Sequence, residues 1–149
     1  MEACLSAETQ TFRVTLRRSV YRDIEIESTK SLYDLAEAIT GAFDFDFDHA
    51  FGFYSGATPA TMLKQQPKYE LFADIGEETD AKSVKKTRIG DAFTETRRSM
   101  TFLFDYGDEW SFQVEMTGTG EKDPKLRYPR LVGSKGEAPE QYPDPDDDA

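Results

Sequence analysis

The only histidine of the chain, His49, is the one side chain that titrates near neutral pH without help from its surroundings. An imidazole can act as a general base or as a ligand when a carboxylate orients it and a reactive group lies within reach. The sequence contains no Gly-x-Ser-x-Gly turn, and its single cysteine, Cys4, lies near the amino end. The simplest interpretation gives His49 a hydrogen bond to a carboxylate or a carbonyl beside a sheet, and a binding role is the alternative.

Three carboxylates lie within five residues, Asp105, Asp108 and Glu109, and the only tryptophan, Trp110, follows them directly. Such a group could bind a cation, or it could form an acid–base pair if burial raised the pKa of one member. The same residues are also typical of a hairpin turn, in which Asp side chains accept hydrogen bonds from turn amides while the tryptophan packs into the core. Both interpretations stay open, and we keep Asp105, Asp108 and Trp110 as candidate binding residues, with His49 on the opposite wall of a cleft.

Three aspartates have the spacing of the first ligands of a calcium-binding loop, and two phenylalanines alternate with them: Asp44, Phe45, Asp46, Phe47 and Asp48. That loop needs Gly at position six and Glu at position twelve, where this chain has His49 and Ser55. The alternation instead predicts buried rings and exposed carboxylates. Zinc sites built from several thiols or imidazoles are excluded by the single cysteine and histidine, and we expect neither a metal nor a cofactor.

The chain has 29 acidic and 18 basic residues and a formal charge of −11 at pH 7. This balance is wrong for a protein whose affinity depends on neutralising phosphates, so we expect a neutral or cationic protein or small ligand as partner rather than nucleic acid. The basic residues come in pairs or triplets, the densest being Arg17, Arg18 and Arg22, and we interpret them as solvated faces. A signal peptide and an apolar run of roughly 18 residues are both missing, so we expect a cytoplasmic protein without membrane contact.

Alternation of apolar and polar residues predicts the strands. They are expected at residues 11–17, 20–27, 49–54, 69–72, 100–105 and 110–117. Apolar residues spaced three and four apart predict a helix over 32–43, with Ser31 as its amino cap and Asp34 at the reciprocal position. A helical turn is expected at 89–93, and the polar segment 77–86 is expected to be an exposed connection.

These elements predict an α+β fold, because the strands outnumber the helices and the two do not alternate regularly. We expect a mixed, mostly antiparallel sheet of about 4–6 strands in ββα-β-(α)-ββ order, packed with one main helix. Residues 1–10 are expected to form a flexible amino end and residues 11–136 a single domain. Residues 137–149 hold six acidic and no basic residues, which predicts a disordered acidic tail.

Several segments together resemble one family. In chain order they are residues 21–26 (Tyr-Arg-Asp-Ile-Glu-Ile), residues 32–35 (Leu-Tyr-Asp-Leu), the approach to His49 and Phe53, residues 104–110 (Phe-Asp-Tyr-Gly-Asp-Glu-Trp), and residues 128–131 (Tyr-Pro-Arg-Leu) with Gly136. Over about residues 11–140 the chain resembles the plasmid pRiA ORF-three-like family, also labelled insertion-element passenger TnpR-type proteins. The resemblance implies a compact α+β domain and leaves the biochemical activity undefined.

The resemblance also implies which polar residues remain for a site. Relatives often carry a histidine two residues after the first one and another two residues after the tryptophan, where this chain has Phe51 and Phe112. Their proline-rich end typically reads Pro-Pro-Glu-Asp, whereas residues 138–141 here are Ala-Pro-Glu-Gln. The remaining candidate binding residues are His49, Asp105, Asp108, Trp110 and Glu140.

We therefore expect a small binding or interaction module without catalytic activity, because no catalytic constellation is complete. The alternative is a carboxylate-based enzyme, with or without a metal, that uses Asp105 and Asp108 together with His49 as base or ligand. A third hypothesis is weak nucleic-acid contact through the amino-terminal arginines, in line with the mobile-element label. Recombination by serine attack does not fit, because the chain lacks a nucleophile among clustered arginines and a basic DNA-reading segment.

Overall fold

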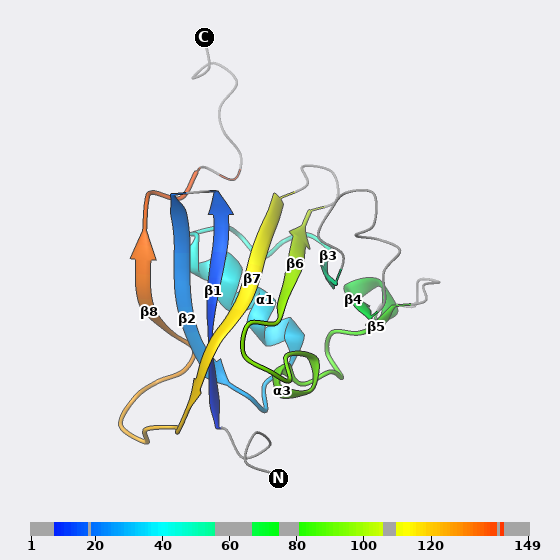
Figure 1. Cartoon of the computed structure of the whole chain (residues 1–149). Helices are drawn as coiled ribbons and strands as arrows, with labels where there is room; N and C mark the ends of the chain where they lie inside the picture. Colours follow the sequence, from blue (N-terminus) through cyan, green and yellow to red (C-terminus); the bar gives the residue numbers. More distant parts are fainter. Residues whose placement is uncertain are drawn as a thin grey trace.

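The computed structural model describes residues 8–17, 19–55, 67–74, 81–105, 110–139 and 141. These residues form strands, two α-helices and a 3-10 helix, η2 (Figure 1). The elements are β1 (Thr9–Arg17), β2 (Val20–Glu27), α1 (Leu32–Ala42), β3 (Phe51–Tyr54), β4 (Lys68–Glu70), η2 (Leu71–Asp74), β5 (Lys82–Ser83), α3 (Ile89–Ala92), β6 (Ser99–Phe104), β7 (Trp110–Gly120) and β8 (Arg130–Lys135). None of the helices in these ranges is long and apolar enough to cross a membrane.

The strands form one sheet in the order β5-β4-β3-β6-β7-β1-β2-β8. β4 and β5 run parallel, whereas the other paired strands of the described chain are antiparallel. The predicted α+β architecture with a mixed, mostly antiparallel sheet is therefore confirmed. The predicted 4–6 strands are too few, because the described residues alone supply eight.

The strands that the alternation misses lie at the two edges of the sheet. β5 has only two residues, and β8 exposes Leu131 and Val132, so neither strand shows a buried face in its sequence. The segment 77–86 is predicted to be an exposed connection; in its described part Lys82, Lys85 and Lys86 are exposed, but Lys82–Ser83 form β5 and Val84 is fully buried. Edge strands bury little on either face, which removes the pattern that predicts a strand.

The alternation in the central strands works as predicted. Phe12 lies opposite Ile24 on β2, and Val14 lies opposite Val114 on β7, with all four side chains buried. The chain enters the sheet at Thr9, two residues before the predicted start of the strand. The hairpin of β6 and β7 also forms as predicted, with residues 104 and 110 paired across it.

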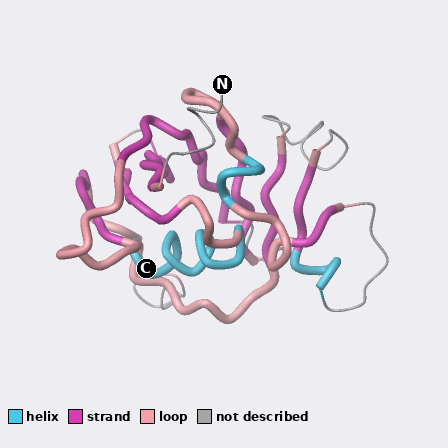
Figure 2. Tube along the Cα trace, turned by 90° about the horizontal axis from the view of Figure 1, so that it is seen from below, coloured by secondary structure: helices cyan, strands magenta, loops and turns pink. Residues whose placement is uncertain are grey.

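α1 begins with the predicted capping box. The Ser31 hydroxyl accepts a hydrogen bond from the Asp34 amide at 3.1 Å, and the Asp34 carboxylate accepts one from the Ser31 amide at 3.1 Å. The apolar side of the helix packs against one face of the sheet (Figures 1 and 2). Its buried residues are Leu32, Leu35, Ala36, Ile39 and Thr40.

Phenylalanine rings fill the space between the helix and the sheet. The fully buried ones are Phe12, Phe43, Phe51, Phe53, Phe93, Phe102, Phe104 and Phe112. Phe102 lies at the centre, with ring centroids 4.9 Å from Phe53 and 5.6 Å from Phe112. Such tilted and edge-on contacts add to the free energy gained by removing the rings from water.

The opposite face of β1, β2 and β7 carries ion pairs instead of a helix. Arg13 and Asp23 form a two-point pair across the hairpin, with the closer nitrogen–oxygen distance 2.9 Å. The other pairs on this face are Arg130–Glu25 at 2.9 Å, Lys122–Glu27 at 2.6 Å and Arg97–Glu115 at 3.7 Å. Exposed pairs of this kind contribute little to stability, so they mainly make this face compatible with water.

Arg22 corrects the interpretation of the amino-terminal arginines as solvated faces. Its side chain is buried on the helix side of the sheet, at 9% exposure. The guanidinium donates to the carbonyl oxygens of Ala42 at 3.1 Å, Tyr21 at 2.8 Å and Lys135 at 3.0 Å, and it lies 4.9 Å from the ring centroid of Phe43. One side chain thus satisfies a carboxyl-terminal carbonyl of α1 and ties the helix to β2 and β8.

We expect Arg22→Ala to lower the free energy of unfolding by about 2–3 kcal/mol, because buried carbonyl oxygens would lose their donor. Arg13→Ala is the matched control on the neighbouring strand, since it removes an ion pair with Asp23 and a cation–π contact with Tyr21 from an exposed side chain and should cost about 1 kcal/mol or less. Urea unfolding measures both variants. Equal losses for the two would contradict the anchoring role of Arg22.

Candidate functional site

His49 lies at the end of the sheet where β6 finishes and β7 begins. Its Nε2 is 3.3 Å from Asp105 Oδ2 and 3.5 Å from Asp48 Oδ1. The imidazole meets the ring of Phe104 edge to face, with centroids 5.9 Å apart, and the side chain stays 36% exposed. The histidine is therefore held between two carboxylates at the rim of the aromatic core.

Asp105 directly follows β6 and adopts a left-handed backbone conformation, with φ of +66°. Its amide donates to the carbonyl oxygen of Ala50 at 2.9 Å, and the residue is only 7% exposed. Asp tolerates this backbone region better than most residues do. The backbone bond to Ala50 brings the carboxylate of Asp105 within reach of His49, so the structure places these two predicted site residues together.

Trp110 lies on the core side of the same strand end. It pairs with Phe104 across the hairpin, and its ring meets Phe45 edge to face at 4.8 Å between centroids. The ring is partly buried against the core, and its Nε1 has no hydrogen-bond partner among the described residues. These contacts give Trp110 a packing role in the core more than a place in the wall of a cleft opposite His49. The other two predicted site residues, Asp108 and Glu140, lie outside the described residues.

The alternating stretch after α1 has the predicted arrangement. Phe45 and Phe47 pack into the core, whereas Asp44, Asp46 and Asp48 are exposed. Among the described residues, no group of three or more His, Cys, Asp or Glu side chains is arranged to hold a metal ion. We call the set Asp44, Asp46, Asp48, His49 and Asp105 the acidic end of the domain.

Gln141 is a residue of this region that sequence reasoning missed. Its side-chain oxygen accepts from the Asp46 amide at 2.6 Å, and its nitrogen donates to the Asp46 carbonyl at 3.2 Å and to Asp48 Oδ1 at 3.4 Å. The residue is 8% exposed. An amide in an acidic, proline-rich segment carries no local signal for such a role, because its partners lie 95 residues away in the chain.

A second buried polar pair lies between β3 and β4. The Tyr54 hydroxyl donates to Glu70 Oε2 at 2.5 Å, and both residues are buried. The tyrosine ring occupies the space that a side chain at Gly52 would need, since a Cβ there would come 2.7 Å from the hydroxyl oxygen. The alternation pattern could not reveal this pair, because it depends on which strand lies next to β3.

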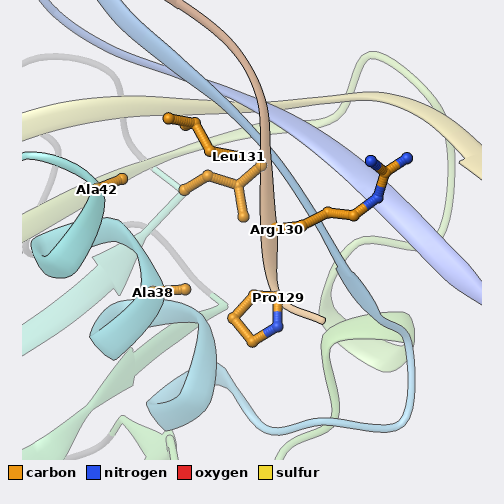
Figure 3. Close-up of a pocket in the computed structure, with 6 residues that line it drawn as sticks. Ala38, Ala42, Pro129, Arg130 and Leu131 are labelled. Atoms are coloured by element: carbon orange, nitrogen blue, oxygen red, sulfur yellow. The ribbon is translucent and has the colours of Figure 1, made fainter. Parts of the chain in front are cut away.

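A hollow of about 190 Å³ opens between α1 and β8 (Figure 3), and His49 is not among the residues that line it. The methyl groups of α1 form one wall and the start of β8 forms the other. The lining residues are Ile24, Ala38, Ala42, Pro129, Arg130 and Leu131. None of them belongs to the predicted site.

The model of the plasmid pRiA4b ORF-3-like proteins matches residues 9–142, which is nearly the whole chain. The chain belongs to this family. The resemblance seen in the sequence is thus confirmed, although the family description carries no activity. A solved structure of a protein of unknown function from Methanosarcina mazei Go1 has the same fold, with a TM-score of 0.69 and 20% identity over 87% of this chain and 70% of that one. No curated protein matches this member of the family.

The left-handed backbone at Asp105 predicts a difference between two substitutions. Asp105→Val should lower the free energy of unfolding by about 1–2 kcal/mol more than Asp105→Asn, because a β-branched residue is disfavoured at positive φ whereas Asn tolerates it. Both variants remove the charge, and measuring both also in a His49→Ala background removes the contact that only Asn could keep, so the difference there isolates the backbone. Thermal unfolding measures it, and a valine variant as stable as the asparagine variant would contradict the described conformation.

Because Nε1 of Trp110 has no hydrogen-bond partner among the described residues, we expect the ring to contribute to stability and the N–H not to contribute. We expect Trp110→Phe to change the free energy of unfolding by about 1 kcal/mol or less. Trp110→Ala should cost about 3 kcal/mol, since it leaves Phe45 without its neighbour. Circular dichroism during urea unfolding measures both. If the phenylalanine variant lost as much as the alanine variant, the N–H would have a role that the geometry does not give it.

Proposed function

We propose that the protein is a binding module without catalytic activity and that its acidic end takes a neutral or cationic partner. The observation that carries the proposal is the arrangement of the stretch after α1. Burial of Phe45 and Phe47 turns three carboxylates outward beside His49 and Asp105. The whole chain adds a field of the same sign, with a net charge of −11. Such a field draws cationic partners and repels anionic ones.

The contacts of His49 support binding over catalysis. Its Nε2 faces the carboxylates of both Asp48 and Asp105, and Asp105 is itself fixed through the backbone of Ala50. These contacts orient the imidazole at the rim of the core. The exposed part of the imidazole is a second point of contact with a neutral part of a partner.

The pair of His49 and Asp105 favours one alternative function, a carboxylate-based enzyme with or without a metal. A carboxylate that orients an imidazole is also the arrangement of a general base. Titration with divalent metal ions discriminates between the two functions. A stoichiometric ion that is lost in Asp105→Asn and in Asp108→Ala would favour the enzyme and contradict the binding module.

A short oligolysine peptide tests the proposed surface. Asp44→Asn/Asp46→Asn/Asp48→Asn should weaken binding of this peptide by about tenfold or more, because three exposed carboxylates at one place are neutralised. The matched control is Asp91→Asn/Glu95→Gln/Glu121→Gln, which changes the net charge equally through exposed residues away from the acidic end. Calorimetry at low salt measures all three proteins.

Equal affinities of the two triple variants would contradict the proposal, since binding would then follow net charge and not the acidic end. Unchanged binding to both variants would contradict it as well. Added salt should weaken binding of the unmodified protein, because surface charges are screened over about 8 Å at physiological ionic strength.

A further inference from the structure

The large apolar side chains that the described residues expose gather on one short stretch. Leu126 is 39% exposed, Leu131 52% and Val132 43%, and all three lie in or just before β8. Exposed apolar residues are normally scattered, and a contiguous group of them marks an interaction surface. Of the three, Leu131 lines the hollow between α1 and β8.

The hollow has the size of one side chain. Ala38 and Ala42 lie four residues apart on α1, so their methyl groups share one side of the helix, facing Pro129 and Leu131 (Figure 3). Small side chains on the helix leave the space open. Its volume of about 190 Å³ is below the roughly 300–1,000 Å³ of small-molecule pockets, which favours a single apolar side chain over a metabolite.

The charge around the hollow differs from that of the whole chain. Residues 121–136 hold five basic and two acidic residues, although the chain has a net charge of −11. The nearby acids of β2 are already paired, Glu25 with Arg130 and Glu27 with Lys122. The other basic residues of this stretch are exposed and form no ion pair with the described residues: Lys125, Arg127 and Lys135.

Two other occupants fit less well. A strand added along β8 would meet the register shift opposite Asp23 and Ile24, where the bulged strand interrupts a regular ladder of hydrogen bonds. A second copy placed by a two-fold axis would bring the same basic stretch against itself, because such an interface joins identical patches. The unpaired basic residues instead complement a foreign segment of opposite charge.

We infer that the hollow between α1 and β8 docks an acidic peptide segment of a partner protein, which inserts one large apolar side chain between Ala38, Ala42 and Leu131. The acidic residues of the segment lie over Lys125, Arg127 and Lys135. The exposed carboxylate of Glu37 is on the α1 side, so the acidic flanks run along the β8 side. This surface is distinct from the acidic end, which takes partners of the opposite charge.

A nitrogen-15 NMR titration of the full chain tests the inference. The probe is a short synthetic peptide with one leucine between aspartates and glutamates. We expect saturable shifts of amides in β8 and in the second half of α1. A peptide with serine in place of leucine should bind about tenfold more weakly or worse, because it loses the burial of the apolar side chain.

Variants separate the apolar contact from the charge. Ala38→Leu fills the hollow and should weaken peptide binding about tenfold or more without lowering the melting temperature. Lys125→Gln/Arg127→Gln/Lys135→Gln should weaken it by a similar factor, because three attractive charges are removed. The matched control, Lys30→Gln/Lys82→Gln/Lys86→Gln, removes three exposed lysines elsewhere and should change binding less than about twofold.

Several results would overturn the inference. One is the absence of saturable shifts at β8 with the peptide at millimolar concentration, and another is equal binding of the leucine and serine peptides. Shifts at β8 that depend on protein concentration without peptide would assign the surface to a second copy. Binding only after deletion of residues 142–149 would assign the hollow to the chain's own carboxyl end. Neutralising the three aspartates of the acidic end should not weaken this peptide, so the two proposals fail separately.

Discussion

The rings on one face of the sheet must be kept from water, and one long helix is too small to cover them. α1 has 11 residues and is about 16 Å long, whereas eight strands span roughly 34 Å across the sheet. Eight phenylalanines are fully buried, and those that lie on strands occupy the four adjacent strands β3, β6, β7 and β1. The chain therefore needs further cover after α1, and Phe45 and Phe47 supply it by packing over β6 and β7. Burial of these rings is the constraint from which the rest of the described structure follows.

The chemistry at the acidic end is a consequence of that burial. Once Phe45 and Phe47 point inward, the alternating backbone turns Asp46 and Asp48 outward, and Asp44, with φ of +60°, lies exposed in the turn after α1. The same path brings His49 against the edge of Phe104 and within 3.3 Å of Asp105. Gln141 then holds residues 44–48 in place by hydrogen bonds to the amide and the carbonyl of Asp46. On this account, packing of the aromatic core determines where the reactive side chains lie. The proposed binding surfaces are the places around that core where charged or small side chains stay exposed.

The elements that could be predicted from sequence are those whose pattern repeats locally. The hairpins of β1–β2 and β6–β7 show clear alternation, and α1 shows both helical spacing and its capping box, so their positions follow within one to three residues. β8 could not be predicted, because an edge strand with exposed Leu131 and Val132 has no buried face to reveal it. The roles of Arg22 and Gln141 depend on partners 113 and 95 residues away, which no local pattern encodes. At the site, the closeness of His49 and Asp105 could be predicted from the sequence, because each of them lies at the end of an aromatic stretch that the alternation predicts to be a strand.

The chain carries one tryptophan and one histidine, so each reports on a single place. Trp110 packs on Phe45 within the core, and His49 lies at its rim. Urea unfolding followed by tryptophan fluorescence and by the NMR signals of the histidine ring, on the same samples, tests whether the core places the acidic end. If it does, the two transitions have the same midpoint and steepness, as expected for one cooperative unit. Loss of the native His49 signals at a lower urea concentration than the change in Trp110 fluorescence would contradict the account, because the acidic end would then be an independent loop.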